Sequence, residues 1–305
     1  MYDIPDGVWP TMITPYTEDN KIDYNCLEEL IEWYVRKGVD GLFAVCQSSE
    51  MFFLSLEERV ELARFVKKVA NGRIPVIASG HISESMKDQI YELKAMADTG
   101  IDALVLISGN LASQDEPDCL AKRNIERFLK EIPDIPMGIY ECPLPYKRII
   151  SPELLKWCAS TERFYFLKDT CRNLSMIRRK VESVKNMKLK VFNANAATLL
   201  ETLKMGVAGY SGVMANFHPD LYAWLINNWR TKQEEALKLQ HFLGFSSAIE
   251  YQVYPVNAKY YLKLEGLNIL QLSRSRDMSL FDHSHKIEVE DLHYLSKLYS
   301  DSLTY

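Results

Sequence analysis

The sequence predicts an α/β fold in which a (β/α)8 TIM barrel is followed by a small helical domain at the C-terminal end. Eight short apolar runs alternate with amphipathic segments of helical periodicity. Successive runs begin roughly 25–35 residues apart, which is the length of one strand-and-helix unit. After about residue 235 the strand signals stop and only helical patterns continue, as expected for a domain appended to a barrel.

The eight candidate strands are short apolar runs of the kind found in buried parallel sheets. Because parallel strands need crossover connections, each run must be joined to the next by a helix. In chain order the runs are residues 8–13, 41–46, 75–79, 103–107, 137–140, 164–168, 190–193 and 207–212.

Four of the connecting helices have clear signals. Residues 23–37 repeat apolar side chains three and four positions apart, the spacing of one helical face. Residues 55–69 open with Ser55 and Glu58 in the Ser-x-x-Glu pattern of a capping box. Residues 83–98 and 173–184 are further amphipathic stretches.

The predicted domains are the barrel, residues 1–234, and the helical domain, residues 235–305. An open, doubly wound parallel sheet is the competing architecture. No Gly-x-Gly-x-x-Gly turn follows the first apolar run, which weakens the dinucleotide-binding version of that alternative.

Charge and hydropathy exclude several classes of partner. With 36 Lys and Arg against 41 Asp and Glu, the net charge is -5. Nucleic-acid binding needs clustered positive charge, and the basic clusters here are short and mixed with apolar residues. No run is long and apolar enough to span a bilayer, and the N-terminus does not resemble a signal peptide. We therefore expect neither a nucleic-acid nor a membrane partner.

The six cysteines form no C-x-x-C pair, so the spacing suggests neither a zinc site nor a disulfide framework. A reducing cytoplasm suits this pattern best. His283-Ser284-His285 lacks acidic or cysteine partners at a recognised spacing, and we interpret it as a surface loop rather than a metal site.

Lys168 is the first candidate for catalysis, because it ends the apolar run 164–168. Active sites of such barrels lie at the C-terminal ends of the strands. Desolvation there lowers the pKa of a lysine and leaves a neutral amine that can attack a carbonyl. The alternative is a lysine that extends to the rim or pairs with Asp169.

Tyr140 ends the preceding run and is the second candidate. A phenol beside an imine can donate and accept protons at the reacting carbons. The alternative is a packed tyrosine with its hydroxyl at the surface.

Two loops are candidates for substrate binding. The loop after the second run contains Gln47, Ser48 and Ser49, whose hydroxyl and backbone N–H groups can hold a carboxylate. The segment with Gly209 and Ser211 allows close approach of the backbone to a ligand. Each loop can equally be a plain turn that leads into the next helix.

Four segments, in this order and spacing, resemble the dihydrodipicolinate synthase and N-acetylneuraminate lyase family over nearly the whole chain. The step of 28 residues from the tyrosine to the lysine also fits that family. The segments are Thr14-Pro15, Ser48-Ser49-Glu50, Tyr140-Glu141-Cys142-Pro143 and Leu167-Lys168-Asp169.

This resemblance implies a class I mechanism. Lys168 forms an imine with the ketone of pyruvate or a related 2-oxo acid, Tyr140 moves protons, and the Ser48–Ser49 loop holds the carboxylate. The imine itself is the electron sink, so no metal or dissociable cofactor is implied. The resemblance further implies an aldehyde as second substrate and a homotetramer.

Several positions depart from the family pattern. Cys46 and Gln47 replace a glycine and a small hydroxyl residue, and Glu141 replaces an asparagine. In the pattern of the lysine-pathway synthases, an arginine corresponds to Pro145, and a pair of tyrosines corresponds to the stretch around Gly109. These departures disfavour 4-hydroxy-tetrahydrodipicolinate synthase activity.

Residues 210–219 resemble a segment of keto-deoxyglucarate dehydratases and favour a 2-keto-3-deoxy sugar acid as substrate. His218 in this segment is interpreted as a helix-start residue. Aldol cleavage and dehydration both start from the same imine and stay open, as does a barrel that only binds a 2-oxo acid as a regulator.

Overall fold

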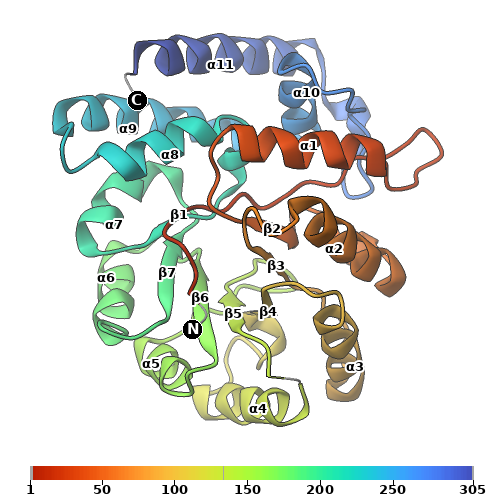
Figure 1. Ribbon diagram of the computed structural model, residues 1–305, viewed down its shortest axis with the longest axis vertical. Coiled ribbons are helices and arrows are strands. Elements are labelled where there is room, and N and C mark those ends of the chain that lie inside the picture. Colours follow the sequence, from red (N-terminus) through yellow and green to blue (C-terminus); the bar gives the residue numbers. More distant parts are fainter. Residues whose placement is uncertain (1–2, 133, 304–305) are drawn as a thin grey trace.

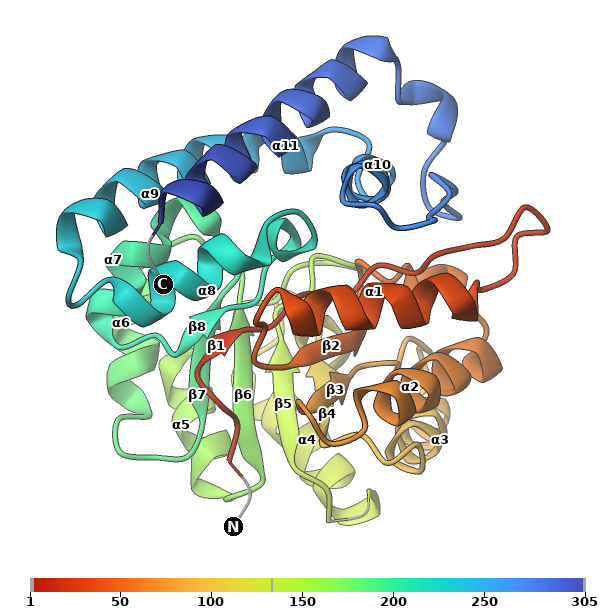
Figure 2. The same cartoon turned by 45° about the horizontal axis from the view of Figure 1, so that its top comes forward.

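A computed structural model describes residues 3–132 and 134–303 of the chain. Parallel strands occupy the centre, helices surround them, and the last helices lie across one end (Figures 1 and 2). The strands are β1 Gly7–Val8, β2 Leu42–Val45, β3 Val76–Ala78, β4 Ala103–Ile107, β5 Met137–Tyr140, β6 Phe164–Asp169, β7 Lys190–Asn193 and β8 Gly209–Tyr210.

The sheet closes into a barrel, which confirms the predicted fold and rules out the open sheet. Its strand order is β1-β8-β7-β6-β5-β4-β3-β2, so the first strand pairs with the last. The remaining seam, between β1 and β2, is closed by a parallel bridge from Thr11 to Phe43. The Met12 N–H donates to the Phe43 carbonyl at 3.0 Å, and the Phe43 N–H donates to the Pro10 carbonyl at 3.1 Å.

The predicted bounds of the first and last strands were too long. Instead of residues 8–13 and 207–212, the ladder covers only β1 and β8. Pro10 has no N–H to donate, which interrupts regular pairing in the first strand. At β8 the two backbones approach so closely that a Cβ on Gly209 would lie 1.9 Å from the Gly7 carbonyl oxygen.

The predicted helices form with their caps. Asp23 accepts from the Cys26 N–H at 3.0 Å, and Ser55 and Glu58 form the predicted capping box. The helices are α1 Tyr24–Arg36, α2 Leu56–Ala70, α3 Met86–Ala97, α4 Asp118–Glu131, α5 Pro152–Ser160, α6 Leu174–Ser183, α7 Leu199–Met205, α8 Pro219–Asn228, α9 Gln233–Ser246, α10 Val256–Leu264 and α11 His283–Ser302.

The C-terminal helices pack directly on the barrel (Figure 2). The predicted domain boundary at residues 234 and 235 falls in the first turn of α9. Gln240 on α9 accepts from the Leu200 N–H at 2.8 Å and donates to the Ala196 carbonyl at 2.9 Å, which ties α9 to the segment after β7.

The interpretation of His283-Ser284-His285 as a loop was wrong. These residues form the first turn of α11, because Asp282 caps the helix and the His285 side chain completes the capping box. Among the described residues, no group of three or more His, Cys, Asp or Glu side chains is arranged to hold a metal ion.

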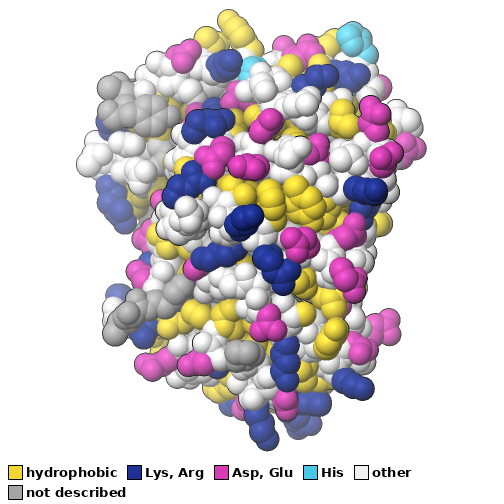
Figure 3. Space-filling model, turned by 45° about the vertical axis from the view of Figure 1, so that its right-hand side comes forward, with side chains coloured by type: hydrophobic (Ala, Val, Ile, Leu, Met, Phe, Trp, Pro, Cys, Tyr) yellow, Lys and Arg dark blue, Asp and Glu magenta, His cyan; other side chains and the backbone are white. Residues whose placement is uncertain are grey.

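Aromatic side chains fill the barrel interior below its C-terminal end. Trp9 and Phe166 lie 5.5 Å apart between ring centroids, and Phe166 stacks on Phe192 at 4.5 Å. This packed interior gives the site above it an apolar floor. In the face shown in Figure 3, acidic and basic side chains are interspersed. None of the described helices has the length and apolarity that a membrane span requires.

Candidate active site

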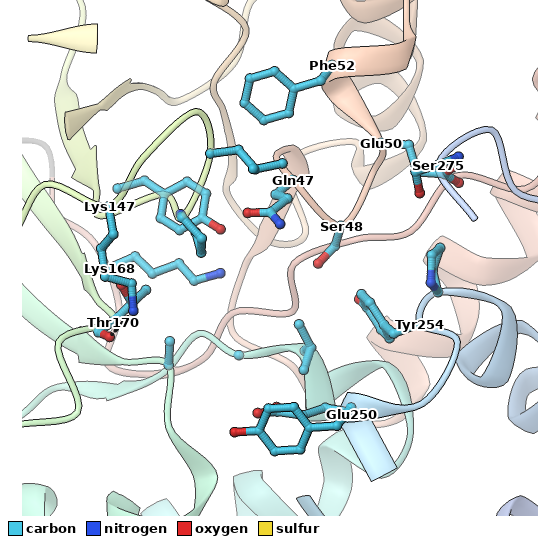
Figure 4. Close-up of a pocket in the computed structure, with 18 of the residues that line it drawn as sticks. Gln47, Ser48, Glu50, Phe52, Lys147, Lys168, Thr170, Glu250, Tyr254 and Ser275 are labelled. Carbon is cyan, nitrogen blue, oxygen red and sulfur yellow. Dashed lines mark hydrogen bonds between the residues drawn. The ribbon is translucent and has the colours of Figure 1, made fainter. Parts of the chain in front are cut away.

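A cavity of about 450 Å³ opens at the C-terminal ends of the strands (Figure 4). Its wall comes from the loops after β2, β5, β6, β7 and β8 and from the C-terminal segment. Predicted residues in this wall are Gln47, Ser48, Tyr140 and Lys168. The structure therefore brings four of the seven predicted site residues together around one space.

Lys168 and Tyr140 are adjacent across two neighbouring strands. The register of β5 and β6 pairs them, and Lys168 Nζ lies 4.4 Å from the centroid of the Tyr140 ring. Lys168 is 3% exposed, and this burial lowers the pKa of its ammonium group to about 8. Pairing with Asp169 does not occur, because successive side chains of a strand point to opposite faces. The arrangement is that of an amine nucleophile beside a phenol.

The lowered pKa of Lys168 predicts the pH dependence of the imine formation that the family resemblance implies. Only the neutral amine attacks a carbonyl, so the rate should rise with pH and level off above about 8. Between pH 7 and pH 9 the neutral fraction, and with it the initial rate, should increase about tenfold. Rapid quenching with pyruvate and borohydride measures this rate. A midpoint at the ordinary value of 10.5 would contradict burial of the amine.

Tyr140 is buried close to Cys142 in the wall of the site. Burial raises the pKa of Tyr140 well above its ordinary value, so the phenol is protonated at neutral pH. The thiol of the neighbouring Cys142 donates to Gln47 Oε1 at 3.5 Å. Gln47, the partner of Cys142, occupies the position where the family pattern has a small hydroxyl residue.

The two serines after β2 have different positions. Ser48 lines the cavity, and its hydroxyl donates to Thr11 Oγ1 at 3.1 Å. Ser49 lies behind the wall, where its Oγ accepts from the Cys46 N–H at 2.8 Å and donates to the Cys46 carbonyl at 2.7 Å. Thr14 donates to the Ser49 carbonyl at 2.8 Å. Ser49 thus shapes the turn that presents Gln47 and Ser48.

Two predicted binding residues, Gly209 in β8 and Ser211 directly after it, are not among the residues that line the cavity. Gly209 is occupied by the close contact with Gly7, and Ser211 is fully buried with no hydrogen-bond partner for its hydroxyl among the described residues. Gly212 and Val213 line the wall instead. These two residues lie at the rim because the chain reaches it only after the end of β8.

Glu141, the unusual residue after Tyr140, belongs to a buried ion cluster on the outer side of the strands. Lys180 of α6 binds both Glu141 and Asp169, and all three side chains have 0% exposure. Glu141 also accepts from the Ile150 and Thr170 N–H groups, each at 2.9 Å. Burial raises the pKa of Glu141, and the Lys180 charge opposes this shift. The cluster joins the residues that directly follow Tyr140 and Lys168.

Replacing Lys180 with methionine should destabilise the fold strongly. The substitution leaves two buried carboxylates facing each other without a cation, at a cost of about 3–5 kcal/mol. Equilibrium unfolding in urea measures the loss. The matched control is Lys238→Met, which removes a surface lysine paired with Glu234 on one helix and should leave stability nearly unchanged. Equal stability of wild type and Lys180→Met would show that the cluster contributes nothing.

The C-terminal segment supplies wall residues that the sequence did not predict, namely Glu250, Tyr251, Tyr254, Ser275 and Arg276. Glu50 anchors part of this segment. Its Oε2 accepts from the N–H groups of Arg274 and Ser275, each at 2.7 Å. Asn216 donates to the Tyr254 hydroxyl at 3.0 Å and to the Thr11 carbonyl at 2.9 Å. In the sequence, the only indication of a role for Asn216 was its position within the segment 210–219.

His218 has the predicted helix-start role. It directly precedes α8, and its ring lies against Ser296 of α11, with Nδ1 2.9 Å from the serine Oγ. Burial lowers the pKa of this imidazole to about 3, so it is neutral. It is not among the residues that line the cavity.

Comparison with known proteins identifies relatives along nearly the whole chain. A model described as the dihydrodipicolinate synthetase family matches residues 5–292. A 4-hydroxy-tetrahydrodipicolinate synthase of Thermodesulfovibrio yellowstonii is 28% identical over 265 residues, which is 85% of this chain and 88% of the relative. One of Haloarcula marismortui is 26% identical over 295 residues, covering 94% and 95% of the two chains.

Solved structures share the fold. A prophage protein of the dihydrodipicolinic acid synthase family from E. coli K12, in complex with pyruvate, superposes with a TM-score of 0.85. It is 23% identical, and the match covers 96% of this chain and 99% of that protein. A dihydrodipicolinate synthase from Thermotoga maritima has the same TM-score at 17% identity, over 97% and 99% of the chains.

Proposed function

Since this chain belongs to the dihydrodipicolinate synthetase family and is a lyase, we propose that it acts on pyruvate or a 2-keto-3-deoxy sugar acid through an imine on Lys168. The observation that carries the proposal is the position of Lys168. Its amine is buried, has a pKa lowered to about 8, and lies against the Tyr140 ring in a cavity large enough for such an acid.

The proposed chemistry follows from these two side chains. The neutral Lys168 amine adds to the ketone carbon, and loss of water gives a protonated imine. This cation accepts the electron pair released when a bond at the neighbouring carbon breaks, in either aldol cleavage or dehydration. Tyr140 supplies the proton for the departing water and takes part in later proton transfers. No dissociable cofactor is needed, because the imine is the electron sink.

The loop at Gln47 and Ser48 is the proposed site of the 2-oxo acid carboxylate. Support comes from its place at the end of β2, opposite Lys168, where hydroxyl, amide and backbone donors converge. Ser49 contributes by holding the turn rather than by direct contact.

Two observations weigh against the synthase reaction named for the curated relatives. Pro145 follows Leu144 at the position of the expected arginine. At Gly109, an added Cβ would lie 2.8 Å from the Tyr146 carbonyl oxygen, so the backbone leaves no room for a tyrosine side chain. A sugar-acid aldolase or dehydratase is therefore the first candidate. A binding protein without turnover is the candidate from another class.

Borohydride trapping followed by a substrate panel tests the proposal. Reduction in the presence of pyruvate should label Lys168, as identified by peptide mass spectrometry. A panel of 2-keto-3-deoxy acids should then reveal release of pyruvate or loss of water. Labelling of a different lysine only, or of none with any 2-oxo acid, would overturn the mechanism. Labelling without turnover of any acid would favour the binding protein.

The proposed assembly is a homotetramer in the cytoplasm. Support comes from the family resemblance and from the six cysteines, all unpaired, which suit a reducing compartment. Light scattering should give about four times 35.2 kDa. A stable and active monomer would contradict this assembly.

A further inference from the structure

One wall of the cavity contains an ion pair that joins the C-terminal segment to the loop after β6. Glu250 lies on the 3-10 helix η5, Ser247–Tyr251, and Arg172 lies in the loop after β6. Arg172 Nη2 donates to Glu250 Oε1 at 2.9 Å, and its Nη1 donates to the Tyr251 hydroxyl. Figure 4 shows Glu250 across the cavity from Gln47, with Lys168 at the side between them.

The pair leaves one oxygen of Glu250 available. Oε2 accepts no hydrogen bond from any described residue, although the side chain is only 16% exposed. This oxygen is not among the fully buried atoms that lack a partner, so it is accessible from the cavity, where a ligand hydroxyl can donate to it. An ion pair that served only to join the two segments would not need to face the substrate space.

Donors that complement this acceptor lie in the same wall. Gln47 Nε2 and Asn195 Nδ2 have no hydrogen-bond acceptor within residues 3–132 and 134–303, whereas their oxygens are used by Cys142 and the Ala197 N–H. Thr170 donates to the Glu141 carbonyl, so its hydroxyl oxygen can accept. A wall with both kinds of group suits a hydroxyl, which donates and accepts at once.

Other substrate classes fit this wall less well. A plain alkyl chain would leave Glu250 Oε2 and both amide nitrogens unpaired, and such loss is what makes polar sites reject analogues that lack a hydroxyl. A second carboxylate would face the Glu250 charge. Besides Lys168, the cations in the wall are Arg172, which is already paired with Glu250, and Lys147 and Arg276, which donate to backbone carbonyls.

We propose that Glu250, oriented by Arg172, is a specificity-determining residue that accepts hydrogen bonds from hydroxyl groups on the substrate chain beyond the imine carbon. The substrate class is then a polyhydroxylated 2-oxo acid. This inference rests on the proposed imine at Lys168 and adds the residue that selects the distal part of the substrate.

Three acids of six carbons test it: 2-keto-3-deoxygluconate with hydroxyls, 2-oxohexanoate with a plain chain, and 2-oxoadipate with a second carboxylate. The measured quantity is the concentration that gives half-maximal borohydride labelling of Lys168, and the mass of the adduct shows whether the added acid or a product formed from it is attached. With wild-type protein, the hydroxylated acid should reach half-maximal labelling at the lowest concentration of the three. In Glu250→Gln the advantage of that acid over 2-oxohexanoate should shrink roughly 10–150-fold, as expected for a hydrogen bond to a charged group.

Matched variants separate this role from a structural one. Glu153→Gln removes a carboxylate from the surface pair with Arg179 and should keep the wild-type ranking of the acids. Arg172→Lys keeps the charge and should keep most of the preference, whereas Arg172→Gln should lose it. If Glu250→Gln does not fold in thermal unfolding, Arg172→Gln carries the test.

The outcomes distinguish the inference from the function on which it rests. If neither pyruvate nor any of the three acids labels the wild-type protein, the proposed imine is wrong. If it is labelled but 2-oxohexanoate is as effective as the hydroxylated acid, the role of Glu250 is wrong. If 2-oxoadipate is the most effective, the wall recognises a second carboxylate through Lys147 and Arg276, and the inference is overturned.

Discussion

Lys168→Met is expected to lose turnover by about 10⁴-fold or more and to lose borohydride labelling completely. The substitution removes the amine that forms the covalent bond in the proposed mechanism, and removal of a covalent nucleophile has effects of this size or larger. Methionine has a similar length and is apolar, so it should fill the space of a side chain that is only 3% exposed. The fold should therefore survive, and the loss can be assigned to chemistry.

The control for this variant is Lys190→Met. Lys190 begins β7 at the opposite end of the barrel and pairs with Asp3 and Asp6 at the surface. This variant should keep both turnover and labelling of Lys168. Full activity of a folded Lys168→Met protein would exclude covalent catalysis at this position.

Tyr140→Phe is expected to lower turnover by about 10²–10⁴-fold, the usual contribution of a positioned acid–base group. Phenylalanine keeps the edge contact with Phe43, whose ring centroid lies 5.6 Å from that of Tyr140. Only the hydroxyl is lost. Steady-state kinetics should show the change in kcat, because the proton transfers occur after the substrate has bound.

Tyr91→Phe provides the comparison for the tyrosine variant. Tyr91 on α3 is 66% exposed, and loss of its hydroxyl should leave the kinetics unchanged. If Tyr140→Phe and Tyr91→Phe both match wild type, Tyr140 has a packing role only, and another group must move the proton.

Lys168 and Tyr140 could be predicted from the sequence because the prediction uses only local features of each strand. An apolar run shows which strand is buried, and the polar residue that ends it lies at the active face of the barrel. The alternation of side chains along a strand also predicts that Glu141 and Asp169 point away from that face. Their partner Lys180 lies on another element and could not be found in this way.

The positions of Gly209 and Ser211 outside the cavity wall have a related cause. Gly209 begins a strand of only two residues and Ser211 directly follows it, so a difference of one or two positions decides between the barrel interior and the rim. The sequence shows a Gly-rich turn but not where pairing with β1 stops. Close contact with Gly7 fixes that point, and it depends on closure of the barrel.

By itself the sequence determined the order of strands and helices, the barrel, the family resemblance, and the lysine and tyrosine at the strand ends. Local periodicity and capping encode these features, because they depend on which face of each element is buried. Only the tertiary structure decided which distant segments complete the site. Arg172 binds Glu250 in the cavity wall, although the two residues are 78 positions apart in the sequence. Glu50 holds residues 274–275 there through contacts that span more than 200 positions. No local pattern specifies such contacts, since they form only when the closed barrel presents its rim to the C-terminal segment.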